Sequence, residues 1–151
     1  MTEVAFHFNL ADKLGYSCRL LRKMSGRGAR AVVLSEPELL GRLDQLLWTF
    51  SGPDFLAHCR SDAKTEVLAA SPVVLAEQLS GLRLNGDPAP ILVNLSAVVP
   101  AGFEKYQRLI ELVGADDEDR ALGRQRWKFY AERGYAIKRH DLAAKGAGDG
   151  A

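Results

Sequence analysis

Residues 4–34 read VAFHFNLADKLGYSCRLLRKMSGRGARAVVL, and their pattern predicts a strand, a helix and a second strand in succession. Residues 4–8 alternate large and small groups in a run typical of a β-strand. A helix is predicted from Asp12, because apolar side chains then recur at helical spacing, at Leu14, Cys18, Leu21 and Met24. Residues 31–34 follow a glycine turn and are typical of a short strand buried on both faces. This order favours an α/β fold.

The following segments continue the alternation of helices and strands. A second helix is predicted from Ser35 and Pro37, with a leucine stripe on one face. Further strands are predicted at residues 55–58, 73–76 and 91–95, with a polar connection between the first two. We therefore expect a mainly parallel sheet with right-handed crossovers and helices on both faces.

The last third of the chain is predicted to contain one long helix. Residues 109–113, before it, fit a helix or a strand equally well. Asp116 is a suitable N-cap, the acidic residues that follow it favour the positive end of the helix dipole, and Gly134 suits the position after the helix end. We interpret the acidic run as this cap rather than as a metal cluster. Residues 143–151 are predicted to be disordered, which leaves residues 1–142 as one folded domain.

Composition places the chain in a broad class. It has 151 residues, of which 47% are hydrophobic and 26% charged, with a formal net charge of +1. These values are typical of one compact domain that folds without metal or disulfide bonds, and the near-neutral charge disfavours a general nucleic-acid binder. Cys18 and Cys59 lack CxxC spacing, and the sequence contains no long apolar run and no signal-peptide pattern. We expect reduced thiols, no membrane segment and a cytoplasmic location.

The sequence indicates no catalytic, cofactor or metal site. Gly26 and Gly28 follow a helix and precede a strand, whereas a dinucleotide site needs its glycines between a strand and the next helix. The phosphate-binding pattern GxxxxGK[ST] is absent from the sequence. His58 and Cys59 are neighbours in a predicted strand and therefore point to opposite sides of the sheet. The other histidines have no acidic or cysteine neighbours at metal-ligand spacing.

The strongest candidate site lies on one face of the final helix. Four residues recur there at i, i+4, i+7 and i+8, namely Arg120, Arg124, Trp127 and Lys128. This spacing places them within one sector of a helix, with Leu122 and Phe129 roughly opposite as the expected core anchors. Residues 120–139 contain seven Lys or Arg residues and one acidic residue, although the whole chain is nearly neutral. We interpret this face as a cationic surface with one aromatic residue.

Such a face suits either a nucleic-acid backbone or a short acidic peptide with apolar and aromatic residues. Arginine pairs with carboxylates through two parallel hydrogen bonds, and the indole ring supplies apolar area. A nucleic-acid track usually needs more phosphate contacts and several stacking platforms, so peptide capture fits better. A solvated helix face, with Trp127 packed under residues 138–139, is the structural alternative.

Trp48 and Phe55 form a second candidate surface, because they flank the turn at residues 51–53. Aromatic residues beside such a turn often close a core, and they are also enriched at the centres of protein interfaces. From this pattern alone, we interpret both as core residues.

Several segments, taken in order, resemble the chi subunit of bacterial DNA polymerase III, an accessory subunit of the clamp-loader assembly. The segments are GARAVVL at 28–34, RLDQLLW at 42–48, PILVNL at 90–95 and RQRWKFY at 124–130, with Gly134 and Tyr135 after the last. The resemblance extends to about Leu142. It implies a single Rossmann-like α/β domain without an active site or cofactor of its own.

The resemblance also implies a ligand for the final helix. In this family, that helix binds the acidic, phenylalanine-ending C-terminal tail of single-stranded DNA-binding protein. The matching positions here are Arg120, Arg124, Trp127 and Lys128, with Val113 nearby. The family more often has lysine at the first of these positions and tyrosine at the third. An adaptor of this kind would contact DNA only indirectly.

A second partner, the psi subunit, is implied by the same resemblance. It links chi to the clamp-loader motor subunits, it occurs only in some bacterial lineages, and the matching contact positions are Trp48 and Phe55. Two other functions stay open at this point. One is a nucleotide-binding protein or enzyme on the same α/β scaffold, and the other is direct binding of single-stranded DNA through residues 120–139.

Overall fold

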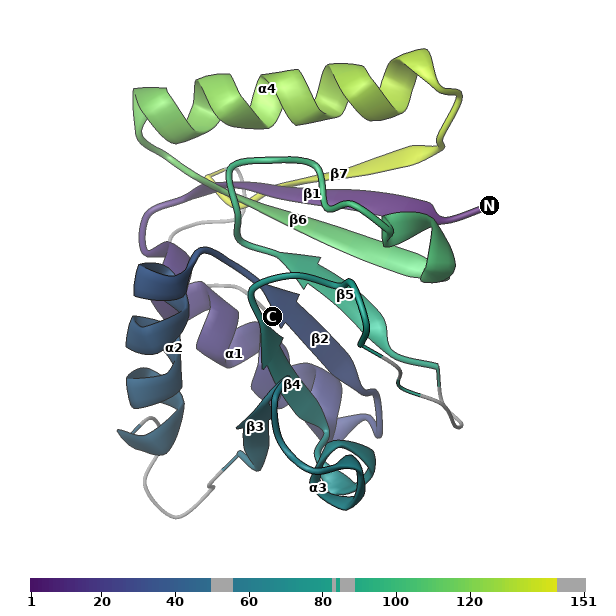
Figure 1. The fold of residues 1–151 in the computed structure, drawn as a ribbon. Helices are drawn as coiled ribbons and strands as arrows, with labels where there is room; N and C mark the ends of the chain where they lie inside the picture. Colours follow the sequence, from purple (N-terminus) through teal and green to yellow (C-terminus); the bar gives the residue numbers. More distant parts are fainter. Residues whose placement is uncertain (50–55, 83, 85–88, 144–151) are drawn as a thin grey trace.

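The computed structural model describes residues 1–49, 56–82, 84 and 89–143, and within them seven parallel strands form one sheet (Figure 1). The strands are β1 (Glu3–Leu10), β2 (Ala31–Leu34), β3 (His58–Arg60), β4 (Val73–Ala76), β5 (Ile91–Asn94), β6 (Arg108–Gly114) and β7 (Ile137–Asp141). The helices are α1 (Lys13–Gly26), α2 (Pro37–Thr49), α3 (Thr65–Ala70) and α4 (Asp117–Glu132), with a short 3-10 helix, η1 (Phe103–Lys105). The strands lie in the order β3-β4-β2-β5-β6-β1-β7. The predicted α/β class and parallel sheet are confirmed.

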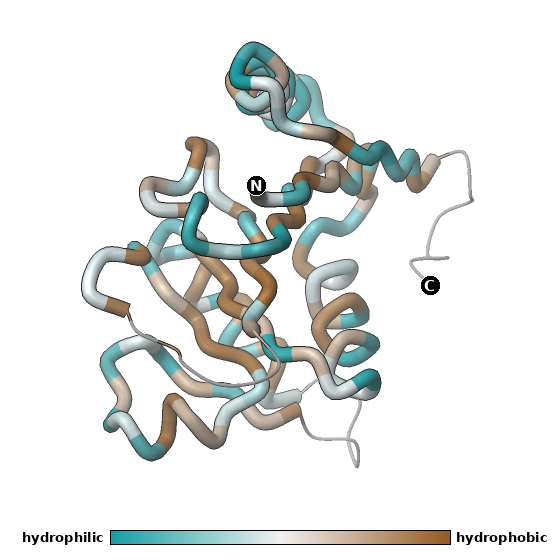
Figure 2. The backbone as a smooth tube through the Cα atoms, turned by 90° about the vertical axis from the view of Figure 1, so that its right-hand side faces the viewer, coloured by the Kyte–Doolittle hydropathy of each residue, from teal (hydrophilic) through white to brown (hydrophobic). Residues whose placement is uncertain are grey.

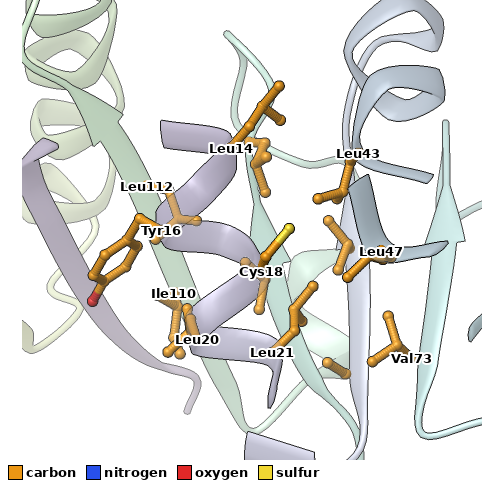
Figure 3. Close-up of a cluster of buried hydrophobic side chains, with 14 of the residues drawn as sticks. Leu14, Tyr16, Cys18, Leu20, Leu21, Leu43, Leu47, Val73, Ile110 and Leu112 are labelled. Atoms are coloured by element: carbon orange, nitrogen blue, oxygen red, sulfur yellow. The ribbon is translucent and has the colours of Figure 1, made fainter. Parts of the chain in front are cut away.

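Alternating residues of the central strands pack into two separate layers. Val33 of β2 and Val93 of β5 belong to a core cluster that α1 and α2 complete with their apolar side chains (Figure 3). Val32 and Leu92 point to the other face and join a second cluster that includes Tyr130 of α4. Successive strand residues point to opposite faces, so a sheet covered on both faces needs the continuous apolar runs that these strands carry.

Three elements differ from the sequence-based prediction. β3 occupies His58–Arg60 rather than residues 55–58, because its backbone pairs with β4 in the register His58↔Val73 and Arg60↔Leu75. The polar connection predicted between β3 and β4 contains the short helix α3. None of its residues is buried, so the sequence there has no need of an apolar stripe that would predict a helix. The edge strand β7, with the sequence IKRHD, is an additional element whose polar composition concealed it.

The ambiguous segment at residues 109–113 belongs to strand β6, which pairs with β1 and β5. The short helix η1 precedes this strand. Residues 144–151, most of the tail predicted to be disordered, lie outside the described residues.

Helix α4 begins where its sequence predicts. The Asp116 side chain accepts a hydrogen bond from the amide of Asp119 at 3.0 Å, which makes Asp116 the N-cap. Asp119 accepts from the amide of Gly114 at 2.6 Å and pairs with Lys13 of α1 at 3.1 Å. After the helix ends, Gly134 adopts a φ of 81°, a left-handed conformation that favours glycine. These contacts fix the first turn of α4 to the carboxyl end of β6.

Helix α4 is largely hydrophilic, whereas apolar residues concentrate in the central strands (Figure 2). Its buried residues are Gly123, Arg126 and Tyr130. Of the two expected core anchors, the half-buried Phe129 packs against the second core cluster, whereas the half-buried Leu122 belongs to neither cluster of the described residues. A different part of the helix faces the sheet because a buried polar network on β5 and β6 receives Arg126 and Tyr130. No helix among the described residues combines the length and the apolar character that crossing a membrane requires.

The buried carboxylate of Glu111 on β6 is the centre of that network. Its Oε1 accepts from Arg126 Nε at 2.8 Å, and its Oε2 accepts from the Tyr130 hydroxyl at 2.6 Å. Asn94 of β5 donates from Nδ2 to both carboxylate oxygens, at 3.0 and 3.1 Å. Arg126 also donates from Nη1 to the carbonyl oxygen of Ala97 at 3.1 Å. The network thus ties α4 to β6, to β5 and to the loop after β5.

Burial changes the proton affinity of two groups in this network. It raises the pKa of the Glu111 carboxyl, while the Arg126 charge and the hydrogen bonds from Tyr130, Asn94 and Arg126 oppose that rise. Burial and the adjacent Glu111 charge also raise the pKa of Tyr130. Tyr130 therefore stays protonated and donates to the carboxylate.

We expect Glu111→Gln to destabilise the fold by about 3–5 kcal/mol, because Arg126 would then be a buried charge without its partner. Tyr130→Phe retains the ring and the ion pair, and it should cost only about 1–2 kcal/mol. Urea unfolding of both variants measures these losses. A loss below about 1 kcal/mol for Glu111→Gln would contradict a role of the ion pair in holding α4.

Helix α4 also approaches β6 closely at Gly123, where a Cβ atom would lie 2.9 Å from both methyl groups of Val113. Glycine to alanine normally stabilises a helix by about 1 kcal/mol, but here we expect Gly123→Ala to destabilise the fold by about 1–3 kcal/mol. Gly26→Ala is the matched control, since a Cβ there would meet nothing within 4 Å. Thermal and urea unfolding of both variants measure the change in stability. A Gly123→Ala variant as stable as the wild type would refute the close approach of α4 to Val113.

Candidate functional site

A pocket of about 410 Å³ lies between α4, β1 and β7, and we call it the α4 pocket. Strands contribute Phe6, Phe8, Asn9, Val113 and Arg139, and α4 contributes Arg120, Gly123, Arg124 and Trp127. Its size falls within the range of about 300–1,000 Å³ that is usual for ligand pockets. Segments far apart in the sequence therefore build one concave site.

The base of the α4 pocket is apolar and aromatic. Phe6 and Phe8 lie two residues apart on β1 and so share the face that α4 covers. The rings of Phe6 and Trp127 lie 5.1 Å apart at 58°, which holds the indole against the sheet. Val113 of β6, only 4% exposed, completes this base beneath Gly123. A ligand ring that enters the pocket would meet aromatic and aliphatic groups.

The rim of the α4 pocket is cationic. Arg120 and Arg124 are exposed one turn apart on α4, and Arg139 is exposed on β7. In the part of the chain that the structure describes, none of these three guanidinium groups forms an ion pair within 4.0 Å. Their charges are therefore available to an anionic ligand, and the apolar base next to them lowers the local dielectric and strengthens such a contact.

The structure brings together four of the five residues that the sequence and the resemblance placed at this site. Arg120, Arg124, Trp127 and Val113 line the α4 pocket, whereas Lys128 does not. The Lys128 Nζ atom lies 3.8 Å from Glu132 Oε1, and both side chains are exposed. Lys128 follows Arg120 by eight residues, which places it about 80° from Arg120 around the axis of α4. This rotation carries its side chain away from the α4 pocket.

Some residues of the α4 pocket escaped sequence analysis. The alternation in β1 would have placed Phe6 and Phe8 on one face, but nothing in the sequence shows that α4 covers that face. The structural alternative placed residues 138–139 over Trp127, and the Cζ atom of Arg139 does lie 5.7 Å from the centre of that ring, but on a strand that the sequence did not predict. Conversely, Arg126 was counted with the surface cations, although it is 2% exposed and pairs with Glu111.

The second candidate surface lies on α2 and β3. Trp48 is 63% exposed, so the interpretation of this residue as part of the core is wrong. Its ring lies 5.1 Å from that of His58, whose Nε2 atom lies 2.8 Å from Asp44 Oδ1. Leu46, 37% exposed, adds apolar area on the same helix. Phe55 lies outside the described residues.

A larger hollow, of about 1,710 Å³, lies between the loops that follow β4 and β5. Among the residues that the structure describes, its lining includes the carboxylates of Glu36, Asp62 and Glu77 and the cations of Arg60 and Lys105. Carboxylates repel phosphate groups, so this described part of the lining disfavours a nucleotide.

Comparison with known proteins agrees with the fold. The family described as DNA polymerase III chi subunit, HolC, matches residues 1–138 of this chain. DNA polymerase III subunit chi of Pseudomonas aeruginosa is 29% identical over 148 residues, which cover 94% of this chain and 98% of that protein. The family match includes β1, β6 and the whole of α4. This chain therefore belongs to the DNA polymerase III chi subunit family, a family of accessory subunits of that polymerase.

Proposed function

We propose that this chain is a non-catalytic adaptor that binds the acidic C-terminal tail of single-stranded DNA-binding protein in the α4 pocket. It would thereby link that protein to the clamp-loader assembly of DNA polymerase III. One observation carries the proposal: arginines that form no ion pair with any described residue line a pocket whose base is aromatic. A peptide with acidic residues and a terminal phenylalanine has the complementary chemistry.

This proposal gives distinct roles to four residues of the α4 pocket and to Lys128, which lies outside it. Arg124 pairs with the terminal carboxylate through its planar guanidinium group. Trp127 and Val113 frame the space for the terminal ring. Arg120 attracts the acidic side chains that precede it, and Lys128 does so from farther around α4, where its ammonium group is exposed.

The expected affinity is modest. A short peptide offers few anchors and loses conformational freedom on binding, so we expect a Kd on the order of micromolar or somewhat tighter. Since the cations on the rim are exposed, added salt should weaken binding. Such an affinity suits an adaptor that must release and rebind its partner.

Other functions have less support. A nucleotide-binding role would need an anion site, and the described lining of the larger hollow has more carboxylates than cations. Direct binding of single-stranded DNA would need several stacking platforms, whereas Trp127 packs on Phe6 inside a small pocket. A thermal shift of several degrees with ATP would favour the first of these functions, and saturable oligonucleotide binding at physiological salt would favour the second.

We also propose that Trp48 contacts a psi subunit where the organism has one. The supporting observation is the 63% exposure of Trp48 on α2, since exposed aromatic groups often anchor interfaces. This surface lies at the β3 end of the strand order, and the α4 pocket lies at the β7 end. Two partners could therefore bind at the same time.

Titration with a synthetic peptide that carries the acidic, phenylalanine-ending tail tests the α4 pocket. We expect Arg124→Ala to weaken binding by roughly 1–3 kcal/mol with little change in fold stability, because the residue is exposed. Arg27→Ala removes the same charge from an exposed position after α1 and should bind like the wild type. If the wild type fails to bind, or if Arg124→Ala binds equally well, the assignment is wrong.

Trp48→Ala tests the second surface against a purified psi subunit. We expect binding to fall by about 2 kcal/mol or more, and fold stability to change by less than about 0.5 kcal/mol. Val67→Ala is the control, since Val67 is another exposed apolar residue, on α3. Equal psi binding by wild type and Trp48→Ala would argue against this surface.

A further inference from the structure

The α4 pocket has a wall that does not belong to α4. Strand β7 pairs with β1 in the register Phe6↔Arg139. The side chain of Arg139 therefore projects from the same face of the sheet as that of Phe6, the face that α4 covers. Its neighbour Lys138 pairs with Ala5 and points to the opposite face. Arg139 therefore stands across the aromatic base from the arginines of α4.

Two aromatic rings hold the guanidinium group of Arg139 at the pocket. Its Cζ atom lies 5.5 Å from the ring centre of Phe8 and 5.7 Å from that of Trp127. Both distances are within the cation–π range of about 6 Å. Such contacts engage the charge through the ring faces and leave the N–H groups free to donate.

No internal carboxylate neutralises Arg139 within the described residues, where it forms no ion pair within 4.0 Å. The acid nearest along the strand, Asp141, is engaged elsewhere. Its Oδ1 atom accepts from Asn9 Nδ2 at 2.8 Å and from the amide of Ala143 at 3.0 Å. The guanidinium group of Arg139 is thus held at the pocket, and its N–H groups can donate hydrogen bonds to a ligand.

An anion at the mouth of the α4 pocket would meet arginines from two sides, Arg124 from the helix and Arg139 from the strand. A carboxylate has two oxygen atoms and can accept from two guanidinium groups at once. A carboxamide carries no charge and has one acceptor oxygen. A group that places a ring on the aromatic base and a carboxylate directly beside it is the C-terminal residue of a peptide that ends in an aromatic amino acid.

We propose that Arg139 is a second carboxylate-binding residue of the α4 pocket, which makes the pocket selective for a free C-terminal carboxyl group beside an aromatic side chain. This inference rests on the proposed function and adds to it a second contact and a specificity.

The test compares two peptides of one acidic, phenylalanine-ending sequence, one with a free C-terminal carboxylate and one with a carboxamide. Each is titrated by calorimetry into the full chain as wild type, Arg139→Gln and Lys138→Gln. The last variant is the matched control, because it removes the same charge from the same strand on the opposite face. Thermal unfolding of each variant checks that the fold is intact.

We expect Arg139→Gln to bind the carboxylate peptide about five- to tenfold more weakly and the carboxamide peptide less than about twofold more weakly. Lys138→Gln should change either affinity by less than about twofold. Arg139→Lys keeps the positive charge but loses the planar guanidinium group. It should therefore bind the carboxylate peptide more tightly than Arg139→Gln and more weakly than the wild type.

The outcomes separate this inference from the proposed function. If the wild type binds the carboxylate peptide and Arg124→Ala weakens it, while Arg139→Gln binds like the wild type, the proposed function stands and the role of Arg139 is refuted. Equal losses for both peptides with Arg139→Gln would refute carboxylate selectivity. If the wild type binds neither peptide, both the proposed function and this inference fail.

Discussion

The buried pair of Glu111 and Arg126 is the constraint on which the functional face depends. Helix α4 brings few apolar side chains to the sheet, namely the buried Tyr130 and the half-buried Trp127 and Phe129. The carboxylate of Glu111 adds a contact to Arg126, and Tyr130 and Asn94 satisfy its remaining acceptor sites. A buried ion pair is directional, so it fixes the rotation of α4 as well as its position.

That rotation determines which residues reach solvent. With Arg126 and Tyr130 turned to the sheet, Arg120 and Arg124 remain outside and flank the half-buried Trp127. The absence of a side chain at Gly123 lets the helix settle against Val113, so the base of the α4 pocket is continuous with the core. The same network that stabilises the fold therefore presents the cations next to an apolar cavity, where an anionic ligand is attracted most strongly.

The nearly neutral chain has two chemically different surfaces at opposite ends of its sheet. One end of the strand order, at β7, carries the arginines and the aromatic base, whereas the surface beside β3 carries the exposed Trp48. An acidic peptide and a more apolar partner surface would each find a different chemistry. Under the proposed adaptor function, this separation would let one partner bind without displacing the other.

The sequence by itself determined the α/β class, the buried parallel strands and the capped ends of α4, because these depend on local periodicity and on short-range hydrogen bonds. Helical spacing also placed Arg120, Arg124 and Trp127 on one side of α4 before any coordinates. Only the tertiary structure decided that Arg126 is buried, that Lys128 stands outside the pocket and that Trp48 is exposed. It also brought Phe6, Phe8 and Arg139 to the site, since contacts between residues more than a hundred positions apart depend on strand order and helix rotation, which no local pattern encodes.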